Sequence, residues 1–154
     1  MEKNIIKSLN WYYYGVLILT LISGTLAYFL IMKDFVQAID PSSTLGVILQ
    51  YVIIFDALLT IPAGLYLCKR QCIKLAELTD EAVKLAGYKR AATWRILLVS
   101  NTMVFGIAAF YLMGAYQSML WITAVSAIGW YFTKPSEAKL QAELQPKQPN
   151  QENY

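Results

Sequence analysis

Histidine is absent from this sequence of 154 residues, and charged residues make up only 15% of it. A soluble domain usually carries about 25% charged residues. Without histidine, the side chain that most often acts as a general base or a metal ligand is missing. The sequence also shows no glycine-rich phosphate loop, no carboxylate pair at catalytic spacing and no nucleophile near a base. We therefore expect neither an enzyme nor a cofactor.

Cysteine is scarce, and the two present, Cys68 and Cys72, lie four residues apart. Two thiols without histidine or a further cysteine make a poor zinc site, so we expect no metal there. Free cysteines more often behave as small apolar side chains in a packed interior. The pair is accordingly interpreted as part of the protein's packing.

Long apolar runs dominate the rest of the chain, which is 57% hydrophobic. A bilayer core of about 30 Å requires about 20 helical residues. Four segments meet or approach this length: 11–32, 45–68, 96–113 and 117–133. The sequence thus predicts an all-α membrane protein with four transmembrane helices in two helical hairpins. Residues 1–133 form this domain, and residues 134–154 are expected to form a short helix and a disordered tail rich in Gln, Pro and Asn.

Positive charge lies almost entirely on one side of the predicted bundle. Of the 13 lysines and arginines, only Lys33 falls outside the terminal segments and the loop 69–95. The positive-inside rule then places both termini and this loop in the cytoplasm. We expect the protein in a cell membrane, such as the inner membrane of a bacterium. The loop supplies a cytoplasmic basic face made of Lys69, Arg70, Lys74, Lys84, Lys89, Arg90 and Arg95.

Apolar residues in the loop 69–95 recur at helical spacing, and Gly87 follows them as a plausible helix stop. They are Leu75, Leu78, Ala82 and Leu85. Three interpretations stay open for this amphipathic segment. It lies on the inner leaflet and is attracted to anionic lipid, it docks a partner, or it packs as a helical hairpin under its own bundle.

The two halves of the chain resemble each other, which suggests a parallel internal repeat with its axis along the membrane normal. Three pairs of segments match: 24–31 with 106–113, 64–69 with 129–134, and 74–75 with 139–140. Chance similarity between apolar helix ends is the alternative explanation.

Asp56 is the only charged residue in the second predicted transmembrane segment. Counting about 1.5 Å per residue from Cys68 places it about 18 Å into the bilayer. Since a charge at that depth is costly, its side chain should face the interior of the bundle. Ser23, Gly24 and Gly106 lie at the same predicted depth, and such small residues allow helices to approach closely.

Thr60, Pro62 and Asn101 extend this intramembrane polar site. Asn101 lies at the predicted depth of Thr60, so the two side chains are candidates for a hydrogen bond. Pro62 frees a backbone carbonyl and is a candidate kink. Three roles stay open for Asp56: a proton or cation site, a protonated carboxyl that joins helices, or a contact with a basic residue on a partner's helix.

The sequence as a whole favours a small non-enzymatic accessory or structural subunit that binds other membrane components. Its expected partners are the bilayer, anionic lipid at the inner leaflet, and other membrane subunits or further copies of itself. The alternative is a homo-oligomeric proton- or cation-linked transporter or channel with Asp56 at its intramembrane site. No nucleic-acid partner is expected, because membrane topology already accounts for the distribution of basic residues.

Overall fold

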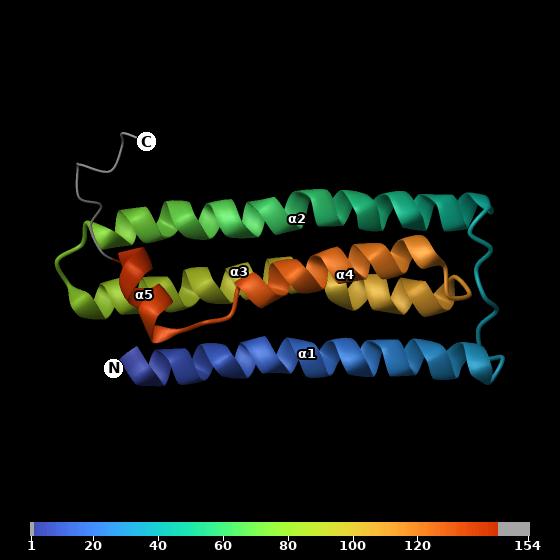
Figure 1. Cartoon of the computed structure of the whole chain (residues 1–154), viewed down its shortest axis with the longest axis horizontal. Helices are drawn as coiled ribbons and strands as arrows, with labels where there is room; N and C mark the ends of the chain where they lie inside the picture. The colour runs from blue at the N-terminus through green and yellow to red at the C-terminus, as the bar shows by residue number, and fades with distance from the viewer. Residues whose placement is uncertain (1, 145–154) are drawn as a thin grey trace.

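The computed structural model of the chain describes residues 2–144, and these residues form an all-helical protein. The described residues form five helices, which are labelled in Figure 1. They are α1 (Glu2–Met32), α2 (Thr44–Ala76), α3 (Glu81–Leu112), α4 (Gln117–Phe132) and α5 (Glu137–Leu144). The all-α prediction is confirmed. The predicted disordered tail, from residue 145 onward, lies outside the described residues.

Helix α3 is the centre of the bundle, with α1 and α2 on opposite sides of it and α4 against its second half (Figure 1). In the most apolar 18-residue stretch of each long helix, 44% of the residues are buried in α3, compared with 22% in α1 and 11% in α2. The first two helices therefore do not pack on each other as the predicted hairpin. Each packs on α3 instead, whereas α3 and α4 do form a hairpin.

Three of the helices are long and apolar enough to cross a membrane: α1, α2 and α3. This supports a membrane protein with several crossings, and the large apolar side chains exposed along α1 and α2 agree with it. Helix α4 has 16 residues, a length of about 24 Å, which is shorter than a bilayer core of about 30 Å.

The stretch 69–95 is a packed helical hairpin, which was one of its three interpretations, and not a separate amphipathic helix. Helix α2 runs on to Ala76 and α3 begins at Glu81, with Asp80 as its N-cap. The four residues of the apolar stripe are thus divided between two helices and the turn that joins them. Gly87 does not stop a helix. It lies inside α3, where a Cβ would collide with the Leu75 side chain, so the missing side chain lets the ends of α2 and α3 pack closely.

Helix α5 folds back against the same end of the bundle and completes its core there. Leu140 and Leu144 of α5 are buried with residues from α1, α2 and α3. Their partners include Ile6, Leu9, Tyr13, Cys68, Cys72, Tyr88 and Ala91. We call this part of the molecule, residues 3–10, 68–95 and 137–144, the basic end.

Candidate functional site

The first candidate site is a polar cluster between the middles of α2 and α3. The Thr102 hydroxyl donates to Asp56 Oδ2 at 2.7 Å, and Asn101 Nδ2 lies 3.3 Å from both carboxylate oxygens. Thr60 donates to the Asp56 backbone carbonyl at 2.7 Å, and its Oγ1 is 3.1 Å from Thr102 Oγ1. The structure therefore brings Asp56, Thr60 and Asn101 together, and adds Thr102 as the closest partner of the carboxylate.

The other residues predicted for the intramembrane site lie elsewhere. Ser23 donates to the Val104 carbonyl at 3.4 Å, in the contact between α1 and α3. Gly24 packs against Ile107 and Tyr111 of α3, and Gly106 packs against Thr123 of α4. Pro62 is exposed, and α2 continues through it. Ser23, Gly24 and Gly106 therefore belong to helix–helix contacts other than the one that contains the cluster, and Pro62 belongs to none.

The second candidate site is a buried ion pair at the basic end. Arg95 of α3 is only 4% exposed, and its Nη1 lies 2.7 Å from Glu143 Oε1 of α5. Arg95 therefore differs from the prediction that placed it on the solvated basic face. Sequence reasoning also missed Glu143, because nothing local to residue 143 indicates that α5 folds back onto α3. The signal in the sequence for the burial of Arg95 was its position directly before an apolar segment.

Both cysteines and a tyrosine surround this ion pair. The Sγ atoms of Cys68 and Cys72 are 3.9 Å apart, and Cys72 Sγ is 4.0 Å from Glu143 Oε2. Tyr88 is fully buried beside Glu143 and Cys72. Within residues 2–144, its hydroxyl and the Arg95 Nε and Nη2 atoms have no hydrogen-bond partner. Buried polar atoms are normally satisfied, so this cluster has unused capacity to bind a further group.

A pocket of about 670 Å³ opens beside the cluster, between α2 and α5. Its walls combine charged and apolar residues. They include Leu65, Lys69, Cys72, Arg95, Phe132, Lys139 and Glu143. Burial and the nearby Arg95 guanidinium lower the pKa of Lys139. The charged form of Lys139 is therefore disfavoured in the pocket wall. The pocket also connects the surface of the protein with the cluster, because Cys72 and Glu143 line it.

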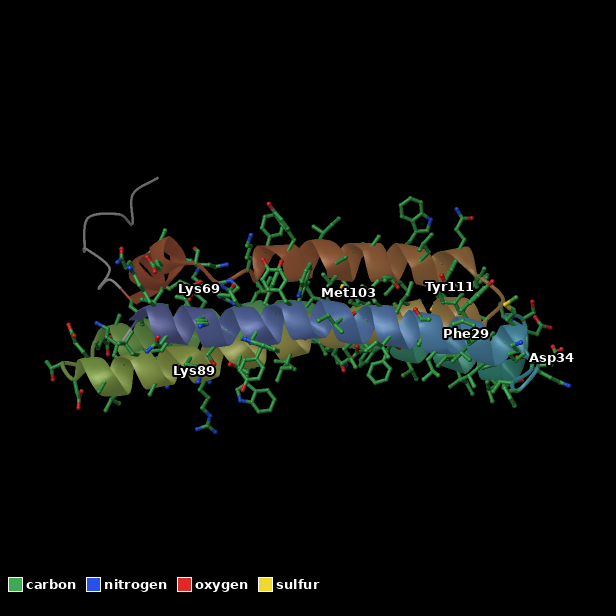
Figure 2. All side chains as sticks on the ribbon, turned by 90° about the horizontal axis from the view of Figure 1, so that it is seen from below. Phe29, Asp34, Lys69, Lys89, Met103 and Tyr111 are labelled. Carbon is green, nitrogen blue, oxygen red and sulfur yellow. The ribbon has the colours of Figure 1, made fainter. Side chains whose placement is uncertain are left out.

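The remaining predicted basic residues surround this end of the molecule on its surface. Lys69, Arg70, Lys74 and Arg90 are exposed, and Lys84 and Lys89 are half-buried. Figure 2 shows Lys69 and Lys89 towards one end of the bundle and Asp34 at the opposite end. Cationic residues from α2 and α3 therefore gather around the buried cluster, at the end where α1 begins.

Comparisons of the chain with known protein families, with curated proteins and with solved structures find no match. The function is therefore inferred from the two clusters and from the distribution of charge. The cluster around Asp56 is largely bonded within the protein. The basic end has both a packed core and polar atoms without partners.

Proposed function

We propose that the chain is an integral membrane protein of the cell membrane with four crossings and both termini in the cytoplasm. In this proposal α4 is the fourth crossing, which its tight packing on α3 supports. The internal repeat stays a prediction. The packing of the helices does not support it, since α3 and α4 form a hairpin and α1 and α2 do not. With this topology the basic end is cytoplasmic, in accordance with the positive-inside rule.

We further propose that the protein is a non-enzymatic accessory subunit that binds other membrane components through the basic end. The observation that supports this role is the packed helical structure of that end. Helix α2 continues eight residues past Cys68, α3 begins well before its apolar segment, and α5 covers both. Because the packed ends of these helices carry exposed lysines and arginines, this part of the fold suits recognition of an acidic partner or of anionic lipid.

A variant with reduced surface charge tests this role. The proposed role predicts that a stoichiometric partner co-purifies with the tagged wild-type chain in mild detergent. In the triple variant Arg70→Gln/Lys74→Gln/Arg90→Gln, we expect the amount of that partner per tagged chain to fall at least ~10-fold. The three side chains are exposed, so the fold should be unchanged. Densitometry and mass spectrometry measure the ratio of partner to bait.

Lys33→Gln, at the opposite end of the bundle, is the matched control and should retain the partner. A cysteine introduced by Gln37→Cys should react with an impermeant reagent in sealed cells, and one introduced by Thr79→Cys should not. A tagged chain that purifies only as a homo-oligomer would contradict the accessory role. Labelling at position 79 would contradict the topology.

The second candidate function is a homo-oligomeric proton- or cation-linked transporter centred on Asp56. One observation favours it: Asp56 is only half-buried, so its carboxylate is not fully enclosed by α3. Its contacts with Asn101 and Thr102 equally suit a structural role that joins two helices. The two roles predict different behaviour for substitutions at this position.

We expect Asp56→Asn to keep most of the stability and Asp56→Leu to lose about 1–2 kcal/mol. An asparagine still accepts the Thr102 hydrogen bond, whereas leucine leaves Thr102 and Asn101 without their partner. Unfolding in detergent micelles measures both variants against the wild-type chain. Equal stability of the two variants would refute the structural role. Loss of proton- or cation-dependent flux in Asp56→Asn proteoliposomes would establish the transporter.

A further inference from the structure

The side chains of Cys68, Cys72 and Glu143 have the arrangement of three ligands around one metal ion. Their ligand atoms all lie within 4.8 Å of one another, and both cysteines are 3% exposed. A tetrahedral zinc ion with Zn–S bonds of about 2.3 Å and a Zn–O bond of about 2.1 Å separates two sulfurs by about 3.8 Å and a sulfur from an oxygen by about 3.6 Å. The observed separations of 3.9 and 4.0 Å are within a few tenths of an ångström of these values.

The buried atoms without partners provide an independent reason to expect a ligand here. Tyr88 is fully buried beside Glu143 and Cys72, and its hydroxyl makes no hydrogen bond of good geometry with any of the described residues, although Glu143 is close to it. Leaving such a group unsatisfied costs about 1–3 kcal/mol. A water bound to the metal as its fourth ligand would give Tyr88 that partner. Arg95 Nε and Nη2, also unpartnered, would find acceptors in thiolates, which accept hydrogen bonds better than thiols.

Ligand type favours a divalent metal such as zinc. Thiolate sulfur and carboxylate oxygen are both ligands that zinc takes in proteins. The two thiolates and the Glu143 carboxylate carry three negative charges, which the metal, the Arg95 guanidinium and the half-buried Lys139 ammonium together offset. Arg95 binds Glu143 through Oε1, so Oε2 remains directed towards Cys72. The guanidinium thus orients the carboxylate for the metal, as partners of metal ligands commonly do.

We propose that Cys68, Cys72 and Glu143 bind a zinc ion at the basic end, with a water as the fourth ligand. The ion reaches the site through the pocket, which Cys72 and Glu143 line. Two ligands come from α2 and the third from α5, so the metal fastens the last described helix to the bundle. This proposal does not depend on the accessory role.

The test uses the full-length protein in detergent, stripped with a chelator and titrated with zinc chloride or cobalt chloride. We expect one metal per chain and a near-ultraviolet thiolate-to-cobalt charge-transfer band with the visible bands of tetrahedral cobalt. The Cys68→Ser/Cys72→Ser variant should lose these bands, and Glu143→Gln should weaken binding at least ~10-fold. Glu77→Gln, a carboxylate in the same pocket but outside the cluster, should bind as the wild type does.

Two results would overturn the zinc site. One is a wild-type chain without a thiolate-to-cobalt band at equimolar metal, a measurement that no folding defect of a variant affects. The other is a double cysteine variant that retains metal at the wild-type stoichiometry. Circular dichroism and gel filtration of each variant separate loss of metal from loss of fold.

Discussion

Replacing Glu143 with alanine in the metal-free protein is expected to destabilise the fold by about 3 kcal/mol. The substitution leaves the Arg95 guanidinium, 4% exposed, without its only ion-pair partner among residues 2–144. Removing one member of a buried ion pair costs about 3–5 kcal/mol, and the lower value applies because the Glu143 side chain is 25% exposed. Urea or thermal unfolding in detergent, with a chelator present, measures the loss.

Glu77→Ala provides the matched control, because Glu77 is an exposed carboxylate of the same pocket and should cost less than about 0.5 kcal/mol. The double variant Arg95→Met/Glu143→Leu should recover most of the loss, since apolar residues often replace a buried pair without cost. If Glu143→Ala were as stable as Glu77→Ala, the ion pair would not contribute to the fold.

Gly106→Leu is expected to cost at least about 2 kcal/mol and to separate α3 from α4. The Cβ of any side chain at position 106 would meet the Thr123 hydroxyl and backbone, and Thr123 is buried in the contact between the helices. Adding methylene groups to a close-packed contact typically costs about 1–3 kcal/mol, and leucine adds four carbons where none fits. The unfolding midpoint in detergent measures the effect.

A glycine without neighbours supplies the control for this substitution. Nothing lies within 4 Å of a Cβ built at Gly15 of α1, so Gly15→Leu should be neutral or slightly stabilising. Since both changes replace glycine with leucine inside a long helix, helix propensity affects them equally. Equal midpoints for the two variants would mean that α3 and α4 do not approach as closely as described.

Depth along a helix could be predicted from the sequence, and this explains why part of the intramembrane site was found. The rise per residue is constant, so Thr60 and Asn101 were expected at one level, with Asp56 deeper in the bilayer. The structure instead pairs Asn101 with Asp56 and Thr60 with Thr102. The neighbour at a given level depends on which helices pack together and on how each is rotated. Ser23 shares the level of Asp56 but lies on the opposite side of α3, and Thr102, next to Asn101 in sequence, was missed for the same reason.

Helix ends were predicted less well than apolar segments, because they depend on different properties. The apolar segments stop near Cys68 and start again near Ile96, where lipid is expected to end. The backbone hydrogen bonds of α2 nevertheless continue to Ala76, and those of α3 already begin at Glu81. Gly87 resembled a stop signal because glycine often ends helices. Its actual role is to admit Leu75, a contact between two helices that no local pattern encodes.

The central place of α3 has a consequence for biosynthesis. A ribosome completes the first two helices before the third, yet those two have no extensive contact with each other. Until the third segment enters the bilayer, the connecting residues 33–43 join them, but no extensive helix packing fixes their relative positions. Insertion of that one segment is therefore the step at which separate spans become a folded protein.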